Sequence, residues 1–269
     1  MWSPSSTEAF LACPMRWALR RRGAVGQASS WSPGLTAGSM FHEAMAAAMN
    51  LQDGEVVRYE PSPHYITEWP EDAEVSYGEA FDRVAKAVQM ALTKEGNALR
   101  RDQRVLATEL NLGGPVDEAA RHGRYWGTLD LLTEDEHGLA VTDYKTHWKM
   151  DSKYADADLR ATARSWQFRQ YAYRAQEIYG RPVTCVRKLL VAFNPTVRVW
   201  PLYTHAITQE ELRVWRDQAE SAWRVMDDID CEGVDAWRNE NACEKYGWAW
   251  RCEYYNHCWD GEPLTWEGA

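Results

Sequence analysis

The sequence predicts an α/β protein in which a central mixed β-sheet is flanked by helices. Two apolar, strand-like segments stand on either side of the polar loop 133–138, which predicts a β-hairpin. A stripe of apolar residues at helical spacing runs through 76–95 and predicts an amphipathic helix that packs on the sheet. Further strand-like segments follow a helix in the last third of the chain, so strands and helices alternate.

Local signals place the remaining elements in chain order. Ser5 and Glu8 have the spacing of a capping box, which predicts a helix from there to about Arg22. The pair Cys13-Pro14 predicts a break in that helix, because proline removes a backbone donor and restricts the residue before it. The other predicted helices cover 36–49, 159–179 and 207–226, and the predicted strands cover 105–112, 124–132, 139–145, 183–193 and 197–203.

Composition limits the class of protein. The chain has 269 residues, 45% of them hydrophobic, which suits one large domain or a core with an added lobe. The formal net charge of −10 argues against a general DNA-coating protein, although the basic stretch 16–22 can still follow phosphates. No apolar stretch is long enough for a membrane span and the N-terminus lacks a signal peptide's apolar region, so a cytoplasmic protein is expected.

The predicted hairpin carries the candidate chemistry. Asp143 and Lys145 point to one face because side chains alternate along a strand, and hairpin pairing brings Asp130 beside them. Carboxylates can hold Mg²⁺ or Mn²⁺, and a lysine can orient water or neutralise charge that grows on a phosphate. The alternative is a solvated hairpin with ordinary surface charges, which has to account for an apolar strand that ends in Asp-Tyr-Lys.

The cysteines form a second candidate site. Cys243, Cys252 and Cys258 lie in a C-terminal segment rich in tryptophan and tyrosine, and Cys13 lies near the N-terminus. Four thiolates suit either a 4Fe–4S cluster or a tetrahedral zinc ion, and their chemistry alone does not choose between the two. Cys185 lies within a predicted strand and is interpreted as an inert core thiol.

Together these motifs resemble the PD-(D/E)XK nuclease superfamily. The hairpin supplies the pattern G-x-x-D followed by D-x-K, and further segments resemble the RecB-like branch of that superfamily. This branch includes the CRISPR-associated Cas-four exonucleases, their phage relatives and the AddB nuclease domain. The segments that carry the resemblance are S-x-x-x-F-x-x-C-P ending at Pro14, G-S-M-F-H ending at His42, Q-x-x-x-Y from Gln167 to Tyr171, and the terminal cysteines.

The resemblance implies a site for one or two Mg²⁺ or Mn²⁺ ions and a DNA substrate. It implies that Lys145 positions the attacking water and that Glu109 contacts the metal from nearby or through water. An edge-strand glutamate without such a role is the alternative for Glu109. The implied metal ligands are His42, Asp130, Asp143 and the Tyr144 carbonyl, and DNA contacts are expected from Gln167, Tyr171, Arg16 and Arg20.

The resemblance also favours an iron–sulfur cluster over zinc at the four terminal cysteines. It implies a restriction-endonuclease-like core at 31–230 and an iron–sulfur lobe formed by 1–30 and 231–269. Within the core, residues 51–74 are expected to form a variable loop because they contain several prolines.

The activity that the resemblance implies is that of a metal-dependent DNA exonuclease. Its substrates would be single strands or DNA ends, with 5′→3′ digestion and some endonucleolytic cutting known among relatives. Two alternatives stay open: a non-catalytic DNA-binding accessory of recombination or replication, and a nuclease stabilised by zinc. A homo-oligomer, a recombination or replication partner and a phage origin are also left open.

Overall fold

The structure is a computed structural model of the chain, and it divides into two compact units. The sheet unit consists of Trp31–Leu112 and Thr128–Leu212, and the terminal unit consists of Met1–Ser30, Gly113–Gly127 and Arg213–Ala269. The residues that the structure describes are 3–25, 32–51, 59–67, 69–71, 73–94, 99, 104–115, 124–125, 127–231, 235–237, 254, 257–258 and 263–266.

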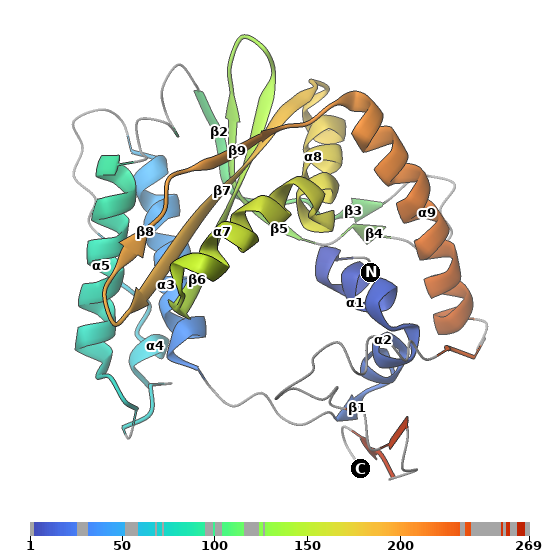
Figure 1. The fold of residues 1–269 in the computed structure, drawn as a ribbon, viewed down its shortest axis with the longest axis horizontal. Helices are drawn as coiled ribbons and strands as arrows, with labels where there is room; N and C mark the ends of the chain where they lie inside the picture. The colour runs from blue at the N-terminus through green and yellow to red at the C-terminus, as the bar shows by residue number, and fades with distance from the viewer. Residues whose placement is uncertain are drawn as a thin grey trace. The chain divides into compact units, whose positions relative to one another are not determined.

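Six strands of the sheet unit form one sheet (Figure 1). They are β2 (Arg104–Asn111), β5 (Thr128–Glu134), β6 (Leu139–Lys149), β7 (Val183–Asn194), β8 (Arg198–Val199) and β9 (Tyr203–Ala206). The order is β2-β5-β6-β7-β8, and β9 also pairs with β7. β6 and β7 are parallel, whereas the other pairings in this sheet are antiparallel. The expected mixed sheet is therefore confirmed, and it is mostly antiparallel.

Helices cover both faces of this sheet (Figure 1). α3 (Pro33–Met49) and α5 (Tyr77–Lys94) pack on one face, and the short helix α4 (His64–Thr67) adds a buried tyrosine to their core. α7 (Ser152–Ala161) and α8 (Trp166–Tyr179) pack on the other face. The helix layers are thus as the sequence predicts, with the sheet between them.

In the terminal unit the two ends of the chain meet. β1 (Ala24–Val25) pairs antiparallel with β10 (Thr265–Trp266), and the Tyr254 hydroxyl donates to the Ala24 carbonyl at 2.8 Å. The other elements here are α1 (Pro4–Ala12), α2 (Pro14–Arg21), β3 (Gly114–Pro115), β4 (Arg124–Tyr125) and α9 (Gln209–Cys231), the last of which begins in the sheet unit.

The predicted break between the first two helices is confirmed at Cys13. The N-cap of α1 is Ser3 rather than the predicted Ser5. The Ser3 side chain accepts a hydrogen bond from the Ser6 amide at 3.0 Å, and the proline after Ser3 suits the first helical position.

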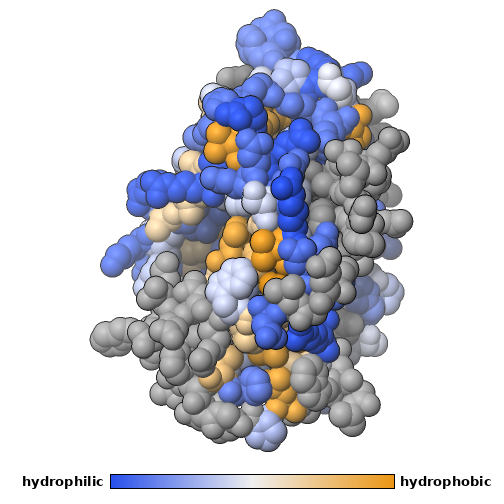
Figure 2. Space-filling model, turned by 90° about the vertical axis from the view of Figure 1, so that its right-hand side faces the viewer, coloured by the Kyte–Doolittle hydropathy of each residue, from blue (hydrophilic) through white to orange (hydrophobic). Residues whose placement is uncertain are grey.

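Exposed apolar side chains are scattered over the surface. The described residues on the face drawn in Figure 2 are largely hydrophilic, with hydrophobic ones exposed among them. Large apolar side chains with high exposure include Leu11 and Trp237 in the terminal unit and Leu35 and Ile66 in the sheet unit. No helix within the described ranges is both long and apolar enough to cross a membrane.

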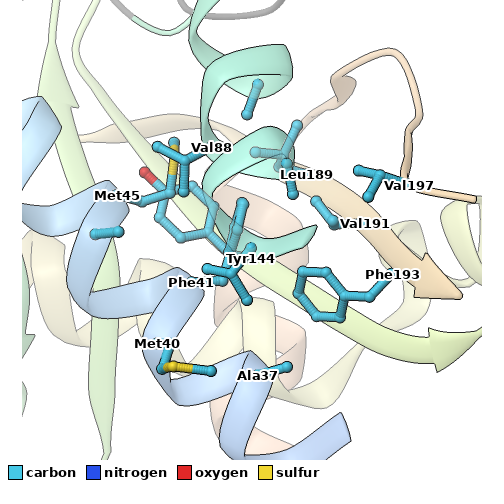
Figure 3. Packing of buried hydrophobic residues seen from close by; sticks show 14 of the residues in the cluster. Ala37, Met40, Phe41, Met45, Val88, Tyr144, Leu189, Val191, Phe193 and Val197 are labelled. Atoms are coloured by element: carbon cyan, nitrogen blue, oxygen red, sulfur yellow. The ribbon is translucent and has the colours of Figure 1, made fainter. Parts of the chain in front are cut away.

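The core between the sheet and the α3–α5 layer contains side chains of the helix and strands that also carry the candidate site residues (Figure 3). The Phe41 ring of α3 lies edge-to-face against Tyr144 of β6, with centroids 6.1 Å apart, and against Phe193 of β7 at 6.2 Å. Such pairs add to the stabilisation that burial supplies. Because Phe41 and Tyr144 are next in sequence to His42 and Asp143, this packing fixes where those two residues emerge.

α3 begins three residues earlier than predicted, because Ser32 caps it and Pro33 fits its first turn. The helix also lies close to β6. A Cβ added at Gly38 would come within 2.6 Å of the Thr146 Oγ1. The absence of a side chain at Gly38 therefore allows the approach that brings His42, one turn further along, to the end of the hairpin.

The helix predicted at 159–179 is in fact two helices, separated by the 3-10 turn η1 (Thr162–Arg164). α8 has its own N-cap, Ser165, whose side chain accepts from the Phe168 amide at 3.4 Å. Periodicity did not reveal this break, because the residues on both sides of it favour a helix. The break gives α8 a new direction, and α8 carries Gln167.

Two aromatic residues of the predicted loop 51–74 are buried. Tyr65 of α4 and Trp69 are 6% and 8% exposed, and the Trp69 Nε1 donates to the Val75 carbonyl at 2.9 Å. The prolines in this segment correctly mark turns, but they do not show which aromatic residues between them are buried.

Candidate metal centre

Three side chains from three elements converge in the sheet unit: His42 of α3, Glu109 of β2 and Asp130 of β5. One ligand atom from each lies within 4.8 Å of the others. The His42 Nδ1 is 3.1 Å from the Asp130 Oδ1 and 4.0 Å from the Glu109 Oε1. One imidazole nitrogen with two carboxylate oxygens is a donor set that suits a divalent ion such as Mn²⁺. The residues present therefore fit a metal centre.

Asp130 is held from two sides. Its Oδ1 faces His42, and its Oδ2 accepts from the Tyr144 backbone amide at 2.5 Å. Burial lowers the pKa of His42, but the carboxylates of Asp130, Glu109 and Asp143 outweigh burial and leave that pKa raised above its usual value. The cluster thus has an excess of negative charge, which favours a bound cation.

Glu109 reaches the cluster through an irregular strand. Its φ is +47°, a left-handed conformation that is uncommon for a residue with a side chain. Burial and the neighbouring Asp130 raise the pKa of Glu109 above its usual value. A strained backbone and like charges held close together are typical of functional sites. The sequence left the role of Glu109 open, and the structure brings its carboxylate to the same point as His42.

The predicted hairpin is confirmed by the antiparallel pairing of β5 with β6. As expected, Asp143 and Lys145 share a face, and the Lys145 Nζ is 2.8 Å from the Asp143 Oδ2. Burial raises the pKa of Asp143 to about 6, against the opposing effect of Lys145. The Asp143 side chain is 3% exposed and that of Lys145 is 36% exposed. The lysine is therefore fixed by a buried carboxylate while it stays open to a substrate.

Gln167 and Tyr171, predicted to contact DNA, lie against the hairpin. The Gln167 Nε2 donates to the Asp143 Oδ1 at 3.0 Å and to the Tyr171 hydroxyl at 2.9 Å. Burial raises the pKa of Tyr171, so the phenol stays neutral and can donate. The structure thus gives Gln167 a contact with a site carboxylate that the motif did not reveal, and the contact of Gln167 and Tyr171 with DNA stays a prediction.

Other predicted residues have different surroundings. The Tyr144 side chain lies in the core and its amide supports Asp130, while the role of its carbonyl stays a prediction. Arg16 and Arg20 lie on α2 in the terminal unit, where Arg20 is exposed. Their contact with DNA also stays a prediction.

Two of the four cysteines lie within the described residues, both in the terminal unit. Cys13 is buried between α1 and α2, and Cys258 is partly buried against a cluster that contains Leu19 and Tyr254. Cys243 and Cys252 lie outside the residues that the structure describes. The donor set of a cluster or zinc site is therefore described only in part.

Sequence reasoning missed Glu43, the residue after His42. Its carboxylate accepts from the hydroxyls of Tyr59 at 2.8 Å and Tyr65 at 2.5 Å. Both tyrosines fall in the predicted variable loop, and no local pattern in that loop shows which residue their hydroxyls reach. The carboxylate also lines a cleft of about 660 Å³ that includes His42 and Glu109.

Comparison with known families defines the class of this protein. The sequence profile of the PD-(D/E)XK nuclease superfamily matches residues 1–258. The chain belongs to the PD-(D/E)XK nuclease superfamily, as its motifs predicted, and this family together with the acidic cluster at the hairpin defines a nuclease.

One solved structure shares the fold of this chain. A protein called "Putative exonuclease" from Eubacterium rectale has a TM-score of 0.53 and 11% identity, over 98% of this chain and 90% of that one. At this identity the likeness shows a shared fold. The structure of SSO0001 has a TM-score of 0.29 and 9% identity, over 56% of this chain and 62% of that one. No curated protein matches this chain.

Proposed function

We propose that this nuclease is a metal-dependent DNA exonuclease that acts mainly on single strands or frayed ends, in the 5′→3′ direction. The observation that carries the proposal is the convergence of His42, Glu109 and Asp130 beside the Asp143–Lys145 pair. The name "Putative exonuclease" given to the Eubacterium rectale protein supports exonucleolytic cleavage.

In this proposal His42, Glu109 and Asp130 hold Mg²⁺ or Mn²⁺, and Asp143 and the Tyr144 carbonyl complete the ligands. When bound, the ion supplies Lewis-acid stabilisation of the charge that develops on the scissile phosphate. The negative charge of the cluster and the raised pKa of Glu109 both support a cation at this place. Asp143 would then exchange part of its contact with Lys145 for the ion.

The chain's own groups around the ion have separate tasks. Lys145 holds the attacking water in line with phosphorus and faces the growing negative charge. Gln167 keeps the Asp143 carboxylate in one orientation, and Tyr171 in turn holds Gln167. In this arrangement the partly exposed ammonium group of Lys145 stays next to the Asp143 carboxylate, where it can meet the substrate.

For the terminal unit, the proposal is a 4Fe–4S cluster held by Cys13, Cys243, Cys252 and Cys258, with zinc as the alternative. The pairing of β1 with β10 and the packing of Cys258 against the segment that follows Cys13 support a joint role of both chain ends. Such a centre would restrain the termini of the unfolded chain as well as the folded one.

The test is a cleavage assay on DNA labelled at either end. Single-stranded and duplex DNA would be incubated with the protein in Mn²⁺, in Mg²⁺ and in chelator. The proposal predicts metal-dependent shortening of single strands, with label released first from the 5′ end. Binding of DNA without cleavage in either metal would instead support the non-catalytic accessory, and release from the 3′ end would reverse the proposed direction.

A further inference from the structure

The cleft beside the candidate metal centre is open and of ligand size. Its volume is about 660 Å³, within the range of roughly 300–1,000 Å³ usual for small-molecule sites. It shares His42 and Glu109 with the metal centre, and its other walls come from the first turns of α3 and the end of β6. A strand that is cut at the metal would therefore have a neighbouring nucleotide against this cleft.

The charge of the cleft suits a base better than a phosphate. Among the described residues that line it there is no lysine or arginine, and Glu43 and Glu109 place two carboxylates in its wall. A phosphate would meet like charge at Glu43, whereas the Glu109 carboxylate faces the proposed metal ion. Carboxylate and hydroxyl oxygens, including that of Ser39, accept hydrogen bonds, which matches the N–H donors on the edges of nucleobases.

The walls also offer a fixed acceptor and an apolar surface. Tyr59 and Tyr65 each donate to one oxygen of Glu43, which orients the carboxylate but leaves a further acceptor position on each oxygen. Leu35 lines the cleft and is 67% exposed, although its neighbours on α3 are polar or packed on the sheet. A planar base that entered the cleft would cover this leucine.

We propose that the cleft is a nucleoside subsite, which takes the unpaired base of a nucleotide next to the scissile phosphate. This inference rests on the proposed nuclease function and adds a reason for its substrate. A base in a duplex is paired and stacked, so it has to leave the helix before it can enter the cleft. The subsite therefore makes single strands and frayed ends the preferred substrates.

The experiment compares an intact single strand with strands in which one nucleotide beside a defined phosphodiester is abasic, in Mn²⁺. For the wild type, loss of the base on one side of the bond should lower kcat/KM by about tenfold, the size expected for one stacked base. Ser39→Phe would fill the cleft from the exposed side of α3, so its rates on the intact and abasic strands should become equal.

A matched control lies on the same helix. Ala47 is exposed, two turns beyond Ser39 and outside the residues that line the cleft. Ala47→Phe should therefore keep the tenfold discrimination. Thermal stabilisation by Mn²⁺ checks the metal centre of each variant. If Ser39→Phe loses that stabilisation, Leu35→Ser serves as the test instead, because it removes apolar surface without adding bulk. Leu35→Ser should reduce the difference in rate between the intact and abasic strands.

The outcomes separate this inference from the proposed function. If the wild type cuts abasic and intact strands at equal rates, the nuclease stands and the subsite is wrong. If the wild type does not cut the intact strand in Mn²⁺ or Mg²⁺, the proposed function fails and the subsite with it. If a stable Ser39→Phe variant still cuts the abasic strand more slowly than the intact strand, the base binds outside this cleft.

Discussion

Lys145 is the residue at which binding and catalysis can be separated. Its Nζ is held 2.8 Å from the Asp143 carboxylate, and its side chain is only partly exposed. We expect Lys145→Ala to lower kcat by about 10²–10⁴-fold, the contribution typical of a positioned acid–base group. The affinity for single-stranded DNA should change little, because one partly exposed charge contributes little to binding. Single-turnover cleavage and fluorescence anisotropy would measure the two effects.

A control for that variant lies four residues further along β6. The Lys149 side chain is 59% exposed and its Nζ is 3.6 Å from a Glu74 oxygen. Surface ion pairs of this kind contribute little. Lys149→Ala should therefore cleave at the rate of the wild type, and normal cleavage by Lys145→Ala would refute the role of that lysine.

Glu109 should show opposite effects on stability with and without metal. An acid whose pKa is raised on folding binds a proton more tightly in the folded state, so its ionised form costs stability as the pH rises through the normal range for glutamate. Glu109→Gln should therefore raise the melting temperature of the metal-free protein at pH 7.

With bound metal, the wild type should instead have the higher melting temperature of the two proteins. Mn²⁺ at about 100 times its Kd adds about 2.7 kcal/mol to the wild type. A Glu109→Gln variant lacks one ligand, so it should gain less at the same concentration. Thermal melts in chelator and in Mn²⁺ would show both effects, and an equal Mn²⁺ gain in both proteins would remove Glu109 from the ligand set.

At the scale of elements, the approach of α3 to β6 depends on a missing side chain. A Cβ at position 38 would lie 2.6 Å from the Thr146 Oγ1, well inside normal contact. We expect Gly38→Ala to lower the free energy of unfolding by about 1–3 kcal/mol through overpacking. It should also weaken Mn²⁺ binding, because α3 carries His42. Urea denaturation and Mn²⁺ titration would measure these effects.

The same geometry supplies a rescue and a control. Thr146→Ala removes the oxygen that the new methyl group would meet, and the remaining contact of 3.7 Å is normal. The double variant should regain most of the lost stability. Gly78 on α5 has open space where its Cβ would lie, so Gly78→Ala should be neutral or slightly stabilising. A destabilised double variant would show that the contact with Thr146 is not the cause.

The elements that the sequence predicted well are those with local signals. The β5–β6 hairpin follows from alternation and a polar loop, and the break at Cys13 follows from the proline after it. The break before α8 was missed because a cap at Ser165 interrupts an otherwise helical pattern. Local reasoning has no means of weighing one cap against the helix-favouring residues on both sides of it.

The candidate site was predictable in its residues but less so in its geometry. Motifs identified His42, Asp130 and Lys145, since their spacing is carried by the chain itself. The place of Glu109 depends on the pairing of β2 with β5 and on its left-handed backbone, which only the folded structure shows. The contact of Gln167 with Asp143 likewise depends on where α8 packs.

At the scale of the whole molecule, the chain ends are joined in one unit. β1 and β10 pair although they are separated by most of the sequence, and the Trp223 Nε1 of α9 donates to the Thr7 Oγ1 at 3.1 Å. Two-residue strands supply few hydrogen bonds, and an isolated short pair is marginally stable. A bound inorganic centre would supply the restraint that so short a pairing lacks.

The last prediction concerns that centre. Protein purified without oxygen should be brown and contain about four irons and four sulfides per chain, the content of one 4Fe–4S cluster. Cys13→Ser should lose colour and iron and melt at a lower temperature, because Cys13 is a proposed ligand. Cys185 lies on β7 in the sheet unit, so Cys185→Ser should keep both the colour and the iron. A colourless wild type with one zinc per chain would make the centre a zinc site, and bleaching of both variants alike would remove the special role of Cys13.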